Sequence, residues 1–167
     1  MCFNVSKGIV AKMATFTRKE IVEGMERLGQ LAVQSGIKIE LALVGGALMV
    51  LRFQARESTR DVDVAILAPG EARIVRELAR IVAAEHGWSN GWLNDGAKGY
   101  LIGLTSGPVV LSAPGIEVRS PATGQLLAMK LSAWRDDIDI ADAWRLLEDE
   151  GQPRKHMARS GTTPGSR

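Results

Sequence analysis

The segment 38–44 constrains the fold most, because its side chains alternate in polarity and then become wholly apolar. That pattern is typical of a strand that enters a buried sheet. Gly45-Gly46 ends the segment, and a short helix is expected over 47–53. A second strand-like segment covers 61–67. Two such strands with an intervening helix predict a sheet that is covered by helices.

Helical patterns flank these strands. Thr17 and Glu20 have the spacing of a capping box, and apolar residues then recur at helical spacing until Gly36. A further helix with its apolar residues between 74 and 82 is expected to end at Gly87. Loops are expected over 54–59 and 87–99, strands over 99–104, 108–112 and 115–119, a helix from the N-cap Ser120 and first-turn Pro121 to about 135, and a last helix over about 137–149.

The order of these elements predicts a mixed α/β or α+β domain with a mixed sheet, covering helices and C-terminal helices. A length of 167 residues suits one domain. We assign 1–16 to a flexible leader, 17–150 to the folded domain and 151–167 to a disordered basic tail. Met13 is an alternative start of the protein.

Composition narrows the class of protein. The apolar fraction of 46% and the charged fraction of 24% are ordinary for a soluble domain. No apolar run is long enough to span a membrane, and the start lacks the features of a secretory signal. Cys2 is the only cysteine, which excludes an internal disulfide framework and favours a cytoplasmic location. The basic tail could attract nucleic acid or be a solvated chain end.

Asp61 and Asp63 are the first candidate for chemistry. Side chains two apart on a strand share one face, so the two carboxylates would lie about 6–7 Å apart. Carboxylates this close repel each other unless a cation lies between them, and Mg²⁺ or Mn²⁺ favours such oxygen ligands. The alternative is an edge strand with a solvent-facing polar side.

Gly45-Gly46 is the second candidate. Glycines between a buried strand and a helix let the backbone approach a ligand closely, with helix N–H groups available for phosphate. A plain tight turn is the alternative explanation. With the acid pair on the next strand, the glycines indicate a phosphate cradle followed by a metal clamp.

The sequence at this point resembles nucleotidyltransferases of the polymerase-beta-like fold. These enzymes show a hydrophobic strand, Gly-Gly or Gly-Ser, a short helix, and then Asp-hydrophobic-Asp on the next strand. Leu43-Val44-Gly45-Gly46 and the stretch from Ser58 to Val64 match this pattern. The gap of 14 residues between Gly46 and Asp61 is slightly longer than is usual for the superfamily.

Later residues narrow the resemblance to the AbiEii-type group, which includes toxins of toxin–antitoxin and abortive-infection systems. The stretch around Lys130 and the aspartates Asp139 and Asp142 are similar to its later motifs, so the resemblance covers roughly 38–147. It implies a nucleotidyltransferase-like fold, an NTP substrate and a Mg²⁺ or Mn²⁺ cofactor. The residues it implies are Asp61, Asp63, Lys130, Asp139 and Asp142 for catalysis, and Gly45, Gly46, Thr59 and Lys130 for the nucleotide.

The later motifs can also be judged without the resemblance. At about 100° per residue, Lys130 lies in the middle of an apolar helix stripe, where an unpaired ammonium is costly. Either this lysine reaches phosphates or a carboxylate, or it snorkels to solvent. Asp139 and Asp142 share one side of the next helix. They either meet a cation such as Lys130 or belong to a solvated face.

Other candidates are weaker. Glu117 is the candidate third metal ligand, because many enzymes of this fold carry a further carboxylate on a later strand. The loop with Trp88 and Trp92 could stack an RNA base, or its tryptophans could close the edge of the core. His86 and His156 have no partner at the spacing of metal ligands.

The main hypothesis is a metal-dependent nucleotidyltransferase that acts on an RNA, a protein or a small molecule. A role in a toxin–antitoxin system, with a cognate antitoxin or toxin as partner, is implied by the resemblance. A second hypothesis is an inactive binding module of the same fold, which binds RNA or a toxin–antitoxin partner. A third is a metal-dependent phosphoesterase, against which the lack of paired histidines counts.

Overall fold

A computed structural model describes residues 15–96, 106–132 and 137–151. Its helices are α1 (Arg18–Gln34), α2 (Gly45–Leu51), α3 (Ala72–His86), α4 (Thr123–Ser132) and α5 (Asp137–Gly151). Its strands are β1 (Phe16–Thr17), β2 (Ile39–Leu43), β3 (Ser58–Thr59), β4 (Val62–Ala68), β5 (Leu93–Asn94), β6 (Ser106–Ala113) and β7 (Ile116–Pro121). The predicted strand over 99–104, residues 1–14 of the predicted leader and residues 152–167 of the predicted tail lie outside the described residues, whereas Gly151 is the last residue of α5.

The larger sheet is mixed, as the sequence predicted. It has five strands in the order β5-β4-β2-β7-β6, and β1 pairs with β3 in a separate two-stranded sheet. Strand β2 is antiparallel to β4 and parallel to β7, while β5 is parallel to β4. The predicted class, a mixed α/β domain with helices over a sheet, is confirmed.

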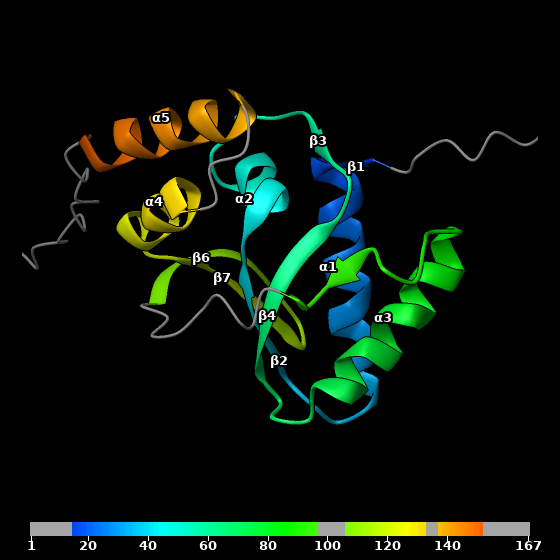
Figure 1. The fold of residues 1–167 in the computed structure, drawn as a ribbon. Helices are drawn as coiled ribbons and strands as arrows, with labels where there is room; N and C mark the ends of the chain where they lie inside the picture. The colour runs from blue at the N-terminus through cyan, green and yellow to red at the C-terminus, as the bar shows by residue number, and fades with distance from the viewer. Residues whose placement is uncertain (1–14, 97–105, 133–136, 152–167) are drawn as a thin grey trace, which may run out of the picture.

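Alternation along the strands separates the two faces of the sheet. Leu41, Leu43, Val62 and Val64 are fully buried on one face, where they join the apolar residues of α1 and α3 in the main core. Figure 1 shows α1 and α3 on this side of the sheet and α4 and α5 on the other. The sheet is therefore the middle layer of the domain.

The second face carries a smaller apolar cluster. Ala42, Val44 and Ala65 are buried there, and Met129 of α4 packs against them. Asp63 alternates with the buried Val62 and Val64 on β4, so its side chain is on this second face. The face that carries the acid pair thus lies under the C-terminal helices.

Two predicted helix ends are confirmed. Thr17 Oγ1 accepts from the backbone N–H of Glu20, and Thr17 N donates to Glu20 Oε2 at 2.8 Å, which completes the capping box. Helix α3 ends at Gly87, whose φ of 68° is the left-handed conformation that glycine adopts most readily.

The predicted N-cap at Ser120 is wrong, since Ser120 and Pro121 are the last residues of β7. Ser120 follows Ile116 and Val118 on the core face and is 1% exposed. Its hydroxyl accepts from Arg52 Nη1 at 2.7 Å, so the serine is engaged inside the fold and α4 begins at Thr123.

Three short strands lie where loop or leader was expected. Strand β3 falls within 54–59, and β5 falls within 87–99. Phe16, assigned to the leader, is in β1, is 2% exposed and belongs to the main core. Strands of two residues are too short for the period-two pattern on which sequence prediction rests.

The tryptophans of the loop after α3 close the edge of the core. Trp92 is 1% exposed, and its indole Nε1 donates to Ala79 O at 2.9 Å. Trp88 packs against Phe16 and Trp92, with ring centroids 5.1 and 5.3 Å apart. The core explanation therefore holds for Trp92, which is not accessible to a base.

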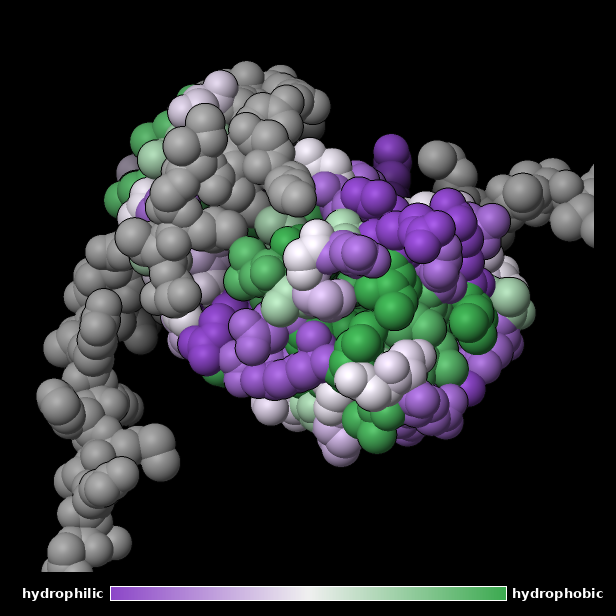
Figure 2. Space-filling model, turned by 90° about the horizontal axis from the view of Figure 1, so that it is seen from below, coloured by the Kyte–Doolittle hydropathy of each residue, from purple (hydrophilic) through white to green (hydrophobic). Residues whose placement is uncertain are grey.

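The surface mixes polar and apolar areas. Figure 2 shows a hydrophobic area bordered by hydrophilic residues on the face seen from below. Exposed large apolar side chains of the domain include Val33, Leu67 and Val109. Apolar atoms make up more than half of an ordinary folded surface, so these residues need no special explanation. Among the described residues, no helix has the length and apolar character needed to cross a membrane.

Candidate functional site

Asp61 and Asp63 lie at the start of β4, with Asp61 just before its first residue. Burial raises the pKa of the Asp63 carboxyl, and the negative charge of Asp61 raises it further. Both effects disfavour a second negative charge at this place. A cation between the two carboxylates would relieve this cost.

Asn94 of β5 fixes the Asp63 carboxylate. Asn94 is the register partner of Asp63 in the parallel pair β4–β5, and its Nδ2 donates to Asp63 Oδ1 at 2.9 Å. This hydrogen bond opposes the rise in the Asp63 pKa. Sequence analysis missed Asn94, because an asparagine in a polar loop carries no periodic signal that would reveal strand pairing.

The Gly45-Gly46 turn packs directly against Asp63. Gly45 has a φ of 63°, and a Cβ there would lie 2.7 Å from Asp63 Oδ2. A Cβ on Gly46 would collide with Thr59 Oγ1 and lie 3.4 Å from Arg56 Nη1. The left-handed φ favours glycine at position 45, and the close approach of Thr59 favours glycine at position 46.

Lys130 of α4 is paired with Asp142 of α5. Lys130 Nζ lies 2.8 Å from Asp142 Oδ2, and the two side chains are 19% and 3% exposed. The alternatives of a snorkelling lysine and of a solvated Asp142 are both wrong. The side chain of Asp139 lies outside the described residues.

Arg56 is the second cation on Asp142. Its Nε donates to Asp142 Oδ1 at 3.3 Å, and its Nη2 forms a short contact with Oδ2. Arg56 and Lys130 thus both contact the Asp142 carboxylate. Sequence analysis missed Arg56, which stands in a polar stretch and meets Asp142 from 86 residues away.

These contacts join six of the predicted residues into one site: Gly45, Gly46, Thr59, Asp63, Lys130 and Asp142. Asp63 abuts Gly45, the adjacent Gly46 abuts Thr59 and Arg56, and Arg56 shares Asp142 with Lys130. The site therefore has an acidic side at Asp61 and Asp63 and a basic side at Arg56 and Lys130. The glycine turn lies between the two sides.

Glu117 is not brought to this site. Glu117 of β7 is in register with Glu40 of β2. The residue that meets Asp63 is Val44, four positions further along the chain, whose N–H donates to Asp63 O. Four residues of a strand span about 13 Å, so Glu117 is displaced far along the sheet. Glu117 is instead paired with Arg119 at 2.7 Å. The sequence pattern predicted its face correctly but could not supply the strand register.

The described residues contain no group of three or more histidine, cysteine, aspartate or glutamate side chains that could hold a metal ion. The acid pair would thus supply two carboxylates at most from the described part of the chain. Mg²⁺ commonly uses one or two carboxylates and completes its shell with water and substrate phosphate oxygens. The donor set fits such a shared site.

Comparison of the chain with protein-family models gave no match, and comparison with curated proteins and with solved structures gave none either.

Proposed function

We propose that the protein is a metal-dependent nucleotidyltransferase, which transfers a nucleotide from an NTP to an acceptor. The observation that carries this proposal is the contact series from Asp63 through Gly45 and Gly46 to Arg56. It sets a carboxylate pair and a basic cluster on opposite sides of one close-packed backbone turn. Phosphoryl transfer needs both features, one to hold a cation and one to bind phosphate charge.

Asp61 and Asp63 are the residues that would hold Mg²⁺ or Mn²⁺. When bound, the ion would neutralise charge on the phosphates and activate the acceptor. Asn94 holds the Asp63 carboxylate in one orientation through its amide. The close approach of carboxylate to backbone at Gly45 limits the freedom of the same side chain.

Arg56 and Lys130 would bind the phosphates of the NTP. Asp142 positions both cations, since each contacts its Oδ2. Thr59 and the backbone at Gly45 and Gly46 would line the nucleotide between the two sides.

In the proposed reaction, an acceptor oxygen forms a bond to the α-phosphorus of the NTP. The bond from that phosphorus to the β-phosphate oxygen breaks, pyrophosphate leaves, and the acceptor proton passes to solvent. An RNA or protein acceptor, a cytoplasmic location and a role in a toxin–antitoxin system are parts of the proposal that rest on the sequence alone.

The proposal is tested by incubating the protein with Mg²⁺ and each α-³²P-labelled NTP, in the presence of total RNA and protein extract. Label in RNA, protein or a small-molecule fraction, with release of pyrophosphate, is expected for one or more of the NTPs. Calorimetry with each NTP in Mg²⁺ accompanies the assay. Absence of both transfer and nucleotide binding would contradict the proposal, whereas binding without transfer would favour a non-catalytic module.

A further inference from the structure

Arg52 joins three elements next to the proposed nucleotide site. It directly follows the last residue of α2, and its Nη1 donates to the Ser120 hydroxyl near the end of β7 at 2.7 Å. Its Nη2 donates to Oγ1 of Thr123, the first residue of α4, at 3.0 Å. The rigid fork of a guanidinium can hold two partners in one fixed geometry. The end of α2 is therefore tied to the start of α4.

The arginine and its β7 partner are themselves held in place. The guanidinium carbon of Arg52 lies 4.6 Å from the centroid of the Phe53 ring, and Phe53 belongs to the main core. A cation over an aromatic face is attracted to it, which favours this orientation of the guanidinium. Ser120 is buried, and its hydroxyl also donates to Pro121 O at 2.7 Å. Arg52 is thus bound between two side chains that are buried in the fold.

Helix α4 extends from this link toward the glycine turn. Thr123 at its start contacts the residue after α2, whereas Met129 packs against the buried cluster that contains Val44, the residue before α2. The rise of a helix is 1.5 Å per residue, so α2 and the part of α4 from Thr123 to Met129 both span about 9 Å. Helix α4 therefore runs from the C-terminal end of α2 to its N-terminal end, where Lys130 follows.

A second arginine holds the other end of α4. Arg56 and Lys130 both contact the buried carboxylate of Asp142, and a Cβ on Gly46 would lie 3.4 Å from Arg56 Nη1. Arg52 and Arg56 thus secure α4 at its two ends, one directly and one through the ion pair of Lys130. The distance between Lys130 and the glycine turn depends on both.

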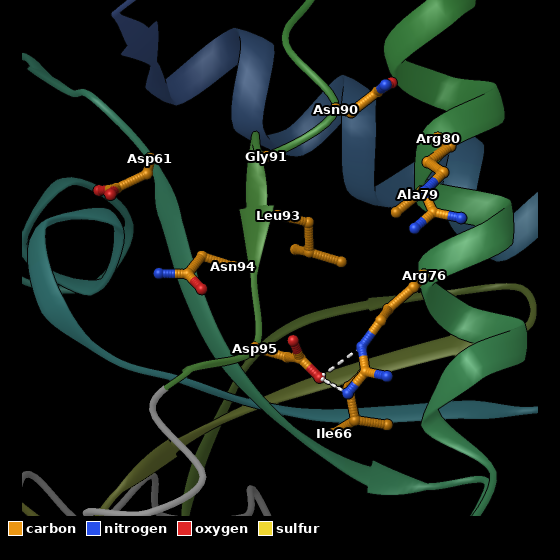
Figure 3. A pocket seen from close by; sticks show the side chains of 10 residues that line it. All are labelled: Asp61, Ile66, Arg76, Ala79, Arg80, Asn90, Gly91, Leu93, Asn94 and Asp95. Atoms are coloured by element: carbon orange, nitrogen blue, oxygen red, sulfur yellow. Dashed lines mark hydrogen bonds and ion pairs between the residues drawn. The ribbon is translucent and has the colours of Figure 1, made fainter.

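Two other arginines connect elements on the far side of the sheet. Arg27 of α1 donates from Nε and Nη2 to Glu85 of α3 at 2.7 and 2.8 Å. Arg76 of α3 donates from Nε to Asp95 at 2.9 Å, within a pocket of about 240 Å³ that Figure 3 shows from close by. Among the residues that the structure describes, neither arginine forms a hydrogen bond or ion pair with α2 or α4. They connect elements as Arg52 does, but away from Lys130.

We infer that Arg52 is a positioning residue of the proposed nucleotide site, which fixes the start of α4 and thereby holds Lys130 beside the Gly45-Gly46 turn. The inference rests on the proposed function. Arg52 acts through Thr123 and not by contact with the nucleotide. Displacement of a binding group by about 1 Å can cost an enzyme about 10²-fold in rate, so a link at the far end of the helix can matter to the site.

The link is tested first without nucleotide or metal, in protein that carries ¹³Cε-labelled lysine. The Cε signal of Lys130 is identified by its loss in Lys130→Met. This signal should shift in Arg52→Met, although Arg52 contacts the opposite end of α4. Arg27→Met is the matched control and should leave the signal in place. An unchanged Lys130 signal in Arg52→Met would overturn the inference.

Nucleotide binding gives the second readout. Calorimetry with each NTP in Mg²⁺ should give a Kd about tenfold higher for Arg52→Met than for the wild type. Arg27→Met should keep the wild-type Kd, whatever its effect on urea unfolding, because its contacts do not reach α4. The same Kd in Arg52→Met and the wild type, or an equal rise in Arg27→Met, would reduce Arg52 to a merely structural residue.

Thr123→Val tests the route by which Arg52 acts. The valine keeps the shape of the side chain and removes the hydroxyl that accepts from Arg52. It should raise the Kd for NTP, and the double variant with Arg52→Met should bind no more weakly than Arg52→Met alone, since two residues that share one contact are not additive. Fully additive effects would show that Arg52 does not act through α4.

The two proposals can fail separately. A wild-type protein that binds no NTP would contradict the nucleotidyltransferase proposal, while a Lys130 signal that shifts in Arg52→Met and not in Arg27→Met would still identify Arg52 as the residue that positions α4. NTP binding and transfer with a Kd that Arg52→Met does not change would remove the role of Arg52 and leave the nucleotidyltransferase proposal in place.

Discussion

Lys130 and Asp142 form an ion pair between two helices, with Lys130 Nζ 2.8 Å from the Oδ2 of a side chain that is 3% exposed. Arg56 contacts the same carboxylate from the segment between α2 and β3. A carboxylate that is removed from solvent in this way needs its cations, and the cations are held in place by it. The pair thus connects the stability of the C-terminal helices to the proposed phosphate site.

We expect Asp142→Asn to destabilise the protein. Breaking a buried ion pair costs about 3–5 kcal/mol, and the partial exposure of Lys130 and Arg56 should reduce the loss to about 1–3 kcal/mol. Urea unfolding measures this change. Glu148→Gln is the control on the same helix, because its pair with Arg145 is exposed, and it should change stability by less than about 0.5 kcal/mol. Equal effects of the two substitutions would contradict the burial argument.

Substitution of the basic cluster should weaken nucleotide binding. Lys130→Met and Arg56→Met each remove one charge that is proposed to contact phosphate, so the Kd for NTP should rise about tenfold or more. Calorimetry in Mg²⁺ measures the effect. Arg145→Met, an exposed arginine of α5 that pairs with Glu148, should leave the Kd unchanged. A phosphate site elsewhere in the protein is indicated if the Lys130 and Arg56 variants bind NTP as the wild type does.

Gly46→Ala should disturb the site through one contact. The added methyl group would collide with Thr59 Oγ1, and overpacking of this kind costs about 1–3 kcal/mol. Thr59→Ala in the same chain removes that oxygen and should restore part of the stability in thermal unfolding. Gly70→Ala is the control, because nothing lies within 4 Å of a Cβ there. No recovery in the double variant would mean that the backbone, and not Thr59, resists the methyl group.

Asp63→Asn should raise the melting temperature at neutral pH. Burial and Asp61 raise the pKa of the Asp63 carboxyl in the folded protein. This carboxyl therefore stabilises the fold below its unfolded pKa, and that stabilisation is lost as pH rises through its folded pKa. The asparagine removes that loss while its side-chain oxygen can still accept from Asn94. A gain of 1 kcal/mol would raise Tm by about 2–4 °C.

The gain from Asp63→Asn should vanish in scanning calorimetry near pH 3, where the wild-type carboxyl is protonated. Mg²⁺ should raise the Tm of the wild type and not that of the variant. A Tm that falls at neutral pH on substitution would contradict this electrostatic account.

Local patterns were sufficient for much of the fold. The capping box at Thr17 depends on side chains three residues apart, and the buried positions of β4 follow from simple alternation. Lys130 in an apolar stripe indicated either an anionic partner, a phosphate or a carboxylate, or a side chain that snorkels to solvent. The structure supplies that partner as Asp142.

What sequence analysis missed depends on pairing between distant segments. Asn94 reaches Asp63 through strand register, and Arg56 reaches Asp142 across the fold. Ser120 has the preferences of an N-cap, but β7 extends through it. Glu117 has the expected face without the expected register. None of these relationships is expressed in the spacing of neighbouring residues.

The central claim is that Asp61 and Asp63 support nucleotide transfer, and a single-turnover assay tests it most directly. Wild type, Asp61→Asn, Asp63→Asn and Glu117→Gln are each mixed with the labelled NTP that gives product, in Mg²⁺ and acceptor extract. We predict that the rate of nucleotide transfer falls about 10²-fold or more in the two aspartate variants and stays close to wild type in Glu117→Gln. Transfer at the wild-type rate by both aspartate variants, in folded protein, would contradict the account.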